Sequence, residues 1–151
     1  MKHLRLLFFL LWFGWPLSQA VGQNWNEGTT INSLVDFNGV HFPSDQIGYA
    51  AGTGGTIYKS TDGGLNWSAQ TSNTTNALQD IYFINTTTGF AVGASGTIRK
   101  TTDGGTTWST QTAAGTSTTT FYEVQFLDAN NGYVVGSGGK MIKTSNGGTT
   151  W

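Results

Sequence analysis

The acidic side chains of this sequence are its best candidates for catalytic acids and bases. Outside a repeated motif described below, the candidates are Glu27, Asp36, Asp45, Asp80, Glu123 and Asp128. Asp80 and Glu123 each stand three residues before a phenylalanine, Phe83 or Phe126, at one position of an internal repeat. Two carboxylates flanking one bond could serve as the acid and base of glycoside hydrolysis. The simpler interpretation, which we favour, is that both are polar residues on one face of two strands, lining a channel.

Other constellations that support catalysis do not occur in the sequence. It has no recognisable Ser/His/Asp arrangement, no phosphate-binding glycine loop and no cluster of metal-ligating residues. It contains no cysteine, so neither a disulfide nor a lipid-modified cysteine can form. We therefore expect no catalytic, cofactor-binding or metal-binding residue, and no cofactor.

One eight-residue string occurs three times and defines the organisation of the chain. It reads STDGGLNW at 60–67, TTDGGTTW at 101–108 and TSNGGTTW at 144–151. Its characteristic residues are Ser60, Asp62, Gly64 and Trp67, then Thr101, Asp103, Gly105, Thr107 and Trp108, and finally Thr144, Asn146, Gly148, Thr150 and Trp151. In every copy the Trp follows a Phe by 25 residues. These strings therefore end three units of one repeat.

The spacing of the units predicts an all-β fold built from β-propeller blades. The Trp residues are separated by 41 and 43 residues, and Trp25 lies 42 residues before Trp67. A period near forty with four strand-like segments is typical of such blades. In the middle unit we expect antiparallel strands at 78–84, 89–93, 97–101 and 107–111. The whole fold would be about three four-stranded repeats, near 26–67, 68–108 and 109–151, of a larger ring.

The eight-residue string is expected to be the turn between the third and fourth strands of each unit. Asp103 can accept hydrogen bonds from its own turn, and Gly104 and Gly105 can supply positive φ angles. Thr101 can add a hydroxyl hydrogen bond, while Trp108 can bury its ring between neighbouring blades. The string is thus first of all a structural staple.

The string Ser/Thr-x-Asp-x-Gly-x-Thr-Trp resembles the Asp-box, also called the bacterial neuraminidase (BNR) repeat. Thr101, Asp103, Gly105, Thr107 and Trp108 match it fully, whereas Asn66 and Asn146 depart from it. The longer pattern, from Phe through Gly-Phe/Tyr-Ala/Val-x-Gly-x-x-Gly-x-Ile to the box, is similar to the photosystem II assembly and stability factor family. The resemblance covers roughly residues 25–151 and implies a propeller.

Families with Asp-boxes imply different activities. Sialidases need three arginines, a Tyr nucleophile and an acidic partner, yet Arg99 is the only arginine after residue 20. The photosystem family is associated with an arginine-rich patch, which a single arginine does not supply. We expect a non-catalytic segment for protein or glycan binding or scaffolding, including assembly of an envelope or photosystem-type complex. The alternative is a fragment of an Asp-box glycoside hydrolase, sialidase-like or xyloglucanase-like.

The first twenty residues read as a cleavable signal peptide. A basic start precedes an apolar run at 6–17 and a small-x-small site at 18–20, so residues 21–151 would be exported: secreted, periplasmic or at the cell surface. We expect no transmembrane segment in the mature chain.

The mature chain has five basic and eight acidic residues, a balance that gives no electrostatic case for binding nucleic acid. Lys59, Lys100 and Lys143 recur at one repeat position and are expected to be solvated charges.

Length variation and the number of units lead to two further expectations. All variation falls between each Trp and the next Phe, which includes the Thr-rich stretches 71–76 and 112–120. If the chain binds a ligand, we expect it at these loops, and loop variation that is tolerated without any ligand is the equally weighted alternative. Closed propellers take about four to eight blades. We therefore expect the chain to be the N-terminal part of a larger protein, with the Trp25 segment closing the last blade. Assembly of several chains into one ring is the less favoured alternative.

Overall fold

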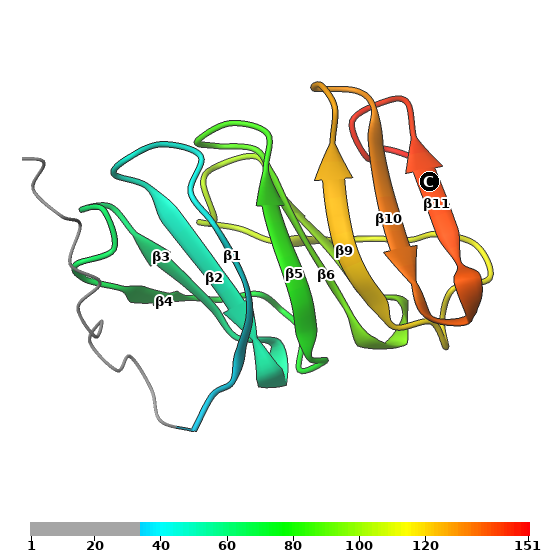
Figure 1. The fold of residues 1–151 in the computed structure, drawn as a ribbon, viewed down its shortest axis with the longest axis horizontal. Helices are drawn as coiled ribbons and strands as arrows, with labels where there is room; N and C mark the ends of the chain where they lie inside the picture. Colours follow the sequence, from blue (N-terminus) through cyan, green and yellow to red (C-terminus); the bar gives the residue numbers. More distant parts are fainter. Residues whose placement is uncertain (1–33) are drawn as a thin grey trace, which may run out of the picture.

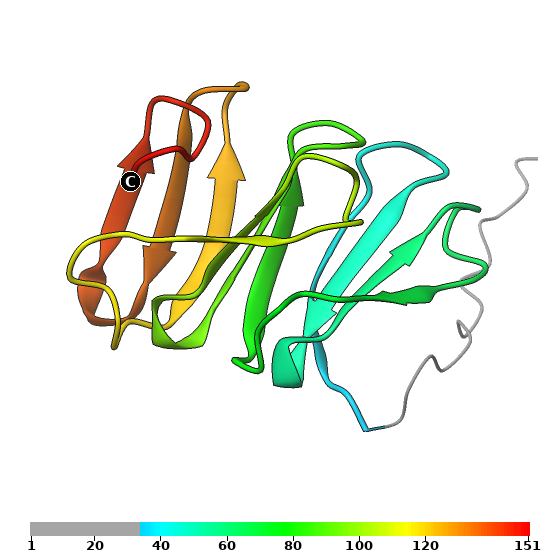
Figure 2. The same cartoon turned by 180° about the vertical axis from the view of Figure 1, so that it is seen from behind.

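The computed structural model describes residues 34–151 as three antiparallel β-sheets that lie side by side (Figures 1 and 2). We call the sheets blades 1, 2 and 3, in chain order. Blade 1 contains β1 (Phe37–His41), β2 (Gly48–Gly52), β3 (Ile57–Ser60) and β4 (Ser68–Gln70). Blade 2 contains β5 (Leu78–Phe83), β6 (Gly89–Gly93), β7 (Ile98–Thr101) and β8 (Ser109–Gln111). Blade 3 contains β9 (Phe121–Phe126), β10 (Gly132–Gly136) and β11 (Met141–Thr144).

Within each blade the strands follow one another as a meander. The order is β1-β2-β3-β4 in blade 1 and β5-β6-β7-β8 in blade 2, whereas blade 3 has three strands, β9, β10 and β11. A single 3-10 turn joins the second and third strands of every blade: η1 (Thr53–Gly55), η2 (Ala94–Gly96) and η3 (Ser137–Gly139). The predicted all-β class and four-stranded middle unit are confirmed, with strand ends within two residues of those expected.

The core lies between the blades. One cluster joins blades 1 and 2 through Tyr49, Ile57, Ile81, Phe83 and Trp108, together with smaller buried residues. A second cluster joins blades 2 and 3 through Phe90, Ile98, Phe121, Val124 and Phe126, among others. Alternate residues of a strand point to opposite faces, so β6 is buried on both sides by neighbouring blades. The sheets are therefore held together face to face by apolar side chains.

Two expectations from the sequence concern residues that the structure does not describe. The signal peptide at 1–20 and the Trp25 segment lie outside residues 34–151. Within 34–151, no helix has the length and apolar character needed to cross a membrane.

Candidate functional site

The eight-residue turn of blade 2 is held by a closed set of hydrogen bonds. The Thr101 hydroxyl donates to Asp103 Oδ1 at 2.8 Å and accepts the Gly105 N–H at 2.9 Å. Asp103 also accepts the N–H and the hydroxyl of Thr107, at 2.9 and 2.6 Å. Gly104 and Gly105 have φ angles of 68° and 86°, a region that favours glycine. The Asp103 carboxylate thus ties the beginning of the turn to its end.

The first copy, between β3 and β4, keeps these bonds although its sequence departs at Asn66. The Ser60 hydroxyl donates to Asp62 Oδ1 and accepts the Gly64 N–H, both at 2.8 Å. Asn66 replaces the threonine, and its amide donates to Asp62 Oδ2 at 2.8 Å. The amide of Asn66 therefore substitutes for the missing hydroxyl.

The third copy follows β11 and keeps the same turn without a carboxylate. The Thr144 hydroxyl donates to Asn146 Oδ1 at 3.0 Å and accepts the Gly148 N–H at 2.9 Å. Asn146 accepts the Thr150 N–H at 3.0 Å and donates to the Thr150 hydroxyl at 2.9 Å. The turn needs an acceptor oxygen at this position, and the negative charge is dispensable for its shape.

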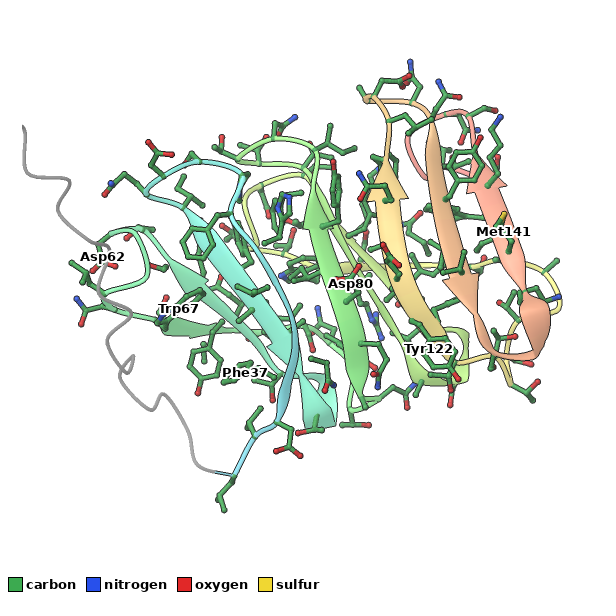
Figure 3. The ribbon with its side chains drawn as sticks, in the orientation of Figure 1. Phe37, Asp62, Trp67, Asp80, Tyr122 and Met141 are labelled. Carbon is green, nitrogen blue, oxygen red and sulfur yellow. The ribbon has the colours of Figure 1, made fainter. Side chains whose placement is uncertain are left out.

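The tryptophan that ends each string meets the phenylalanine 25 residues before it. The rings are edge to face with centroids 5.9–6.0 Å apart in the pairs Phe42–Trp67, Phe83–Trp108 and Phe126–Trp151. Trp108 is only 3% exposed and belongs to the cluster between blades 1 and 2. Trp67 lies in the first turn, close to Asp62 at the outer edge of blade 1 (Figure 3). The strings of blades 2 and 3 therefore contribute to the core as well as to their own turns.

Two of the three recurring lysines join one blade to the next, so the expectation that they are solvated charges is wrong for these two. Lys59 Nζ donates to the Gly104 carbonyl at 2.7 Å, where the Tyr49 hydroxyl also donates at 2.9 Å. Lys100 Nζ donates to the Gly147 carbonyl at 2.6 Å. The glycine turn of one blade thus presents a carbonyl to the lysine of the preceding blade. Sequence spacing shows the recurrence but not this partner, which is more than forty residues away.

The hydrogen bonds of the turns predict acid sensitivity. Bonds from Asn66 and Thr107, respectively, are the largest causes that lower the pKa of Asp62 and of Asp103 from 3.8 to about 2. A carboxyl with a lower pKa in the folded state stabilises the fold above its unfolded pKa, and that contribution is lost as pH falls through its folded pKa. We expect the free energy of unfolding to decrease between pH 4 and pH 2, measured by urea titration at each pH. A variant carrying Asp62→Asn and Asp103→Asn, which gives both turns the side chain that Asn146 supplies in the third, should show a shallower decrease.

Two other carboxyls serve as references in that titration. Hydrogen bonds from Asn131 and Asn130 also lower the pKa of Asp128, so some acid sensitivity should persist in the double variant. Burial raises the pKa of Asp80, which makes its contribution opposite in sign, and Asp80→Asn should leave the decrease in place. An unchanged slope in the double variant would contradict the role given to the turns.

The two carboxylates singled out in the sequence line one groove. Asp80 on β5 and Glu123 on β9 belong to the first strands of adjacent blades, and with His41, Tyr82 and Tyr122 they border a space of about 550 Å³ (Figure 3). We call this the inner groove. Asp80 Oδ2 accepts the Val124 N–H of blade 3 at 2.9 Å, and burial raises its pKa, with Glu123 adding to the effect. Asp80 therefore already has a structural partner across the blade boundary.

A larger groove opens between blades 1 and 2 at the loops that vary in length. It has a volume of about 750 Å³ and is lined by η1, by β4, by residues 71–76 and by Arg99 of β7. We call it the Arg99 groove. Its side chains are mainly hydroxyls and amides, including Gln70, Ser72, Asn73 and Thr74. The groove lies at one of the loops where the sequence led us to expect a ligand.

Arg99 is the chemically distinctive residue of this groove. Its Nη1 donates to the Thr110 hydroxyl, but its buried Nε has no hydrogen-bond partner among residues 34–151. Because this Nε is buried, it is not itself open to a ligand, and Arg99 lines the groove with the rest of its partly exposed side chain. Burial lowers the pKa of Arg99, and the nearby side chains supply no carboxylate to the groove. The arrangement favours a ligand that brings its own anionic oxygen, because guanidinium groups bind carboxylates in a two-pronged manner.

Sequence reasoning did not select Arg99 as a binding residue, although a signal was present. Arg99 occupies the position that Tyr58 holds in the first unit and Ile142 in the third. An isolated arginine at a position that is otherwise aromatic or aliphatic is the exception in the repeat. That exception indicates a local role rather than one shared by all blades.

Comparisons with known proteins agree with the fold. Residues 65–151 match the family model described as Photosynthesis system II assembly factor YCF48. Solved structures with the same arrangement include YCF48 from Cyanidioschyzon merolae, with 24% identity and a TM-score of 0.67 over 78% of this chain and 36% of that one. YCF48 bound to D1 peptide shows 21% identity and a TM-score of 0.70 over 78% of this chain and 40% of that one.

An ancestral GH74 enzyme is also similar, with 20% identity and a TM-score of 0.63 over 76% of this chain and 18% of that one. The chain spans 36–40% of the length of the two YCF48 structures. No curated protein gave a significant match. At these identities the structural likeness concerns the fold.

Proposed function

The chain belongs to the photosynthesis system II assembly factor YCF48 family of BNR-repeat proteins, and from this premise we propose that it is a non-catalytic β-propeller segment that binds and positions a partner protein. The observation that carries the proposal is the Arg99 groove, in which one arginine lies among hydroxyl and amide side chains and no carboxylate is among the lining residues. We propose that this groove takes an extended polypeptide segment bearing a carboxylate. A solved family member described as bound to D1 peptide supports a peptide as the ligand class.

The chemistry of the groove fits a peptide in two ways. Hydroxyl and amide side chains along residues 71–76 can exchange hydrogen bonds with an extended backbone, which has one donor and one acceptor per residue. Arg99 can then fix the register of the segment by pairing with one carboxylate. A glycan carrying a uronic acid would offer the same anionic group, and the experiment below separates the two.

We also propose that the protein is exported from the cytoplasm. The basic, apolar and small-residue pattern of residues 1–20 supports export, in which case the partner would belong to an envelope complex. Sequencing the N-terminus of the protein recovered from an expressing cell tests this point. A mature N-terminus between residues 21 and 23 would support export, and an intact Met1 would contradict it.

The inner groove favours hydrolysis as a second candidate function, because it brings Asp80 and Glu123 together. Against it, the Asp80 carboxylate accepts a backbone N–H of blade 3. Incubation of the chain with xyloglucan oligosaccharides, followed by mass analysis of the products, tests whether the chain is a hydrolase. We expect no cleavage, and cleavage abolished by Asp80→Asn would establish the hydrolase.

Peptide binding can be tested with a library whose two forms differ in one group. Acetylated random hexapeptides that lack Asp and Glu and have a free C-terminal carboxylate are passed over the immobilised full chain, and the same library with a C-terminal amide is the comparison. We expect selective retention of the free acids. In Arg99→Gln the Kd of a retained peptide should rise by about tenfold or more, since a hydrogen bond to a charged group contributes about 1.5–3 kcal/mol.

The matched control is Lys140→Gln, which removes the same charge from a lysine that does not line the Arg99 groove. It should bind like the original chain. Equal retention of acid and amide libraries, or equal loss in the two variants, would contradict the peptide site. Retention of oligogalacturonate in an Arg99-dependent manner, without retention of peptides, would make the partner a glycan.

A further inference from the structure

The Arg99 groove adjoins a second hollow, which has a volume of about 280 Å³. Asn76 and Arg99 line both of them. The rest of the second hollow is formed by residues of η2, β7 and β8 and by the loop at 112–117. We call it the Gln111 groove, after an amide side chain of β8. It lies at the second of the two Thr-rich stretches, so each stretch borders one groove.

The two grooves occupy the same place in successive blades. Gln70 lines the Arg99 groove, and Gln111, 41 residues later, lines the second. Each glutamine lies opposite the first isoleucine of the adjoining strand, β3 or β7. In Figure 2 the connections from β4 to β5 and from β8 to β9 follow equivalent paths between blades. Serine and threonine hydroxyls border both grooves, so the polar lining that suits an extended backbone is present twice.

The two residues that the grooves share are held by hydrogen bonds to blade 2. Asn76 Nδ2 donates to the Thr97 hydroxyl at 2.9 Å, and Arg99 Nη1 donates to the Thr110 hydroxyl. Thr97 and Thr110 both line the Gln111 groove. The Asn76 N–H in turn donates at 3.1 Å to the hydroxyl of Thr74, which lines the Arg99 groove. The boundary between the grooves is therefore a hydrogen-bonded part of the fold, and Arg99 belongs to it.

The charge of the two grooves is concentrated at that boundary. Among the residues that line either groove, Arg99 is the only charged one. A ligand that fills both grooves would place its anionic group in its interior, with neutral hydrogen-bonding chain on each side. An acidic side chain within a polypeptide has this form, because the backbone continues in both directions with one donor and one acceptor per residue. A C-terminal carboxylate would instead end the chain at Arg99 and leave one groove empty.

We propose that the partner segment carries its carboxylate on an internal Asp or Glu and runs through both grooves, with that carboxylate paired to Arg99. The two-groove site rests on the proposed function, because the Arg99 groove is one half of it. A guanidinium group binds a carboxylate with two parallel hydrogen bonds, which fixes the position of the acidic residue along the site. The hydroxyl and amide side chains on each side can both donate to and accept from the flanking backbone.

The test uses peptides blocked at both ends, so that the side chain of one central Asp is the only carboxylate. A library of nonapeptides with Asp at the fifth position, neutral random residues elsewhere, an acetylated start and an amidated end is passed over the immobilised full chain. The two halves of a retained peptide, one ending and one beginning at the Asp, are then made and blocked in the same way. We expect the nonapeptide to have a Kd about tenfold lower than either half, the gain from about two further neutral hydrogen bonds.

Matched substitutions assign each half to a groove. Thr71 and Thr112 are exposed, lie 41 residues apart, and line the Arg99 groove and the Gln111 groove, respectively. Thr71→Trp and Thr112→Trp should each fill one groove and abolish binding of one half, a different half in each variant. Binding of the remaining half should be unchanged, which also shows that the variant is folded. Thr118→Trp, at an exposed residue that lines neither groove, is the control and should bind the nonapeptide like the original chain.

The outcomes separate the two-groove site from the proposed function. A nonapeptide that binds no tighter than its halves, or whose Kd is unchanged in Thr112→Trp, would overturn the two-groove site. If hexapeptide acids are still retained in an Arg99-dependent manner, the peptide site in the Arg99 groove stands and only its extension fails. If neither hexapeptide acids nor nonapeptides are retained, both fail.

Discussion

Replacing Phe83 by alanine is expected to lower the free energy of unfolding by about 3–5 kcal/mol, the usual cost of removing a buried phenylalanine ring. Phe83 is 2% exposed and lies at the contact between blades 1 and 2. Its ring stacks on Tyr49 at 3.6 Å and meets the edge of Trp108 at 6.0 Å. Its loss would leave a cavity that neither neighbour can fill. Equilibrium urea denaturation, followed by tryptophan fluorescence, measures the change.

Phe42→Ala is the matched control, because Phe42 holds the same place in blade 1. It keeps the edge contact with its tryptophan but is 43% exposed and has no ring stacked on it within residues 34–151. The expected loss is about 1 kcal/mol, because the ring is only partly removed from water. Equal losses in the two variants would show that the contact between blades contributes little to stability.

A pair of adjacent glycines provides the second large effect. Gly54 and Gly55 both have positive φ, at 66° and 75°, so alanine at either position is strained by about 1–2 kcal/mol. A Cβ at Gly54 meets nothing within 4 Å, whereas one at Gly55 would lie 2.0 Å from the Thr74 carbonyl oxygen. Gly55→Ala should therefore cost on the order of 4 kcal/mol or more, while Gly54→Ala costs only the strain.

A substitution at Gly55 also tests the shape of the Arg99 groove, because Gly55 and Thr74 both line this groove. Gly55→Ala should displace the loop at 71–76 and weaken peptide retention. Gly138→Ala, at the open position equivalent to Gly54 but outside the groove, should leave retention unchanged. Both quantities come from urea denaturation and the peptide library. Similar stability in the two variants would mean that the loop moves aside freely and does not define the groove.

Much of the fold could be predicted because glycines recur at the same turns of every blade. The middle blade shows this well: the strand predicted at 89–93 is β6, and the turn predicted around Asp103 is present with its hydrogen bonds. Local sequence determines such features, since the partners of each bond lie within four residues. The third sheet has three strands instead of four, because the given sequence ends at the Trp of the third string, before the residues that form β4 and β8 in the other blades.

Contacts between blades could not be predicted, because their partners are about forty residues apart. The sequence predicts a solvated charge at Lys59, whereas the Lys59 Nζ donates a hydrogen bond to the Gly104 carbonyl of the next blade. Asp80 was correctly placed on one face with Glu123, but its bond to the Val124 N–H depends on how closely β5 approaches β9. The sequence shows Arg99 only as a single arginine, because the burial of its Nε depends on how the strands pack.

The most direct test of the account is the NMR signal of the Arg99 side-chain Nε–H. The chain has two arginines, Arg5 and Arg99, so the signal absent from Arg99→Lys identifies the groove unambiguously. Adding a hexapeptide acid retained from the library should shift this signal, while its C-terminal amide should leave it unchanged. If a peptide acid binds and the Arg99 signal does not move, the Arg99 groove is not the binding site.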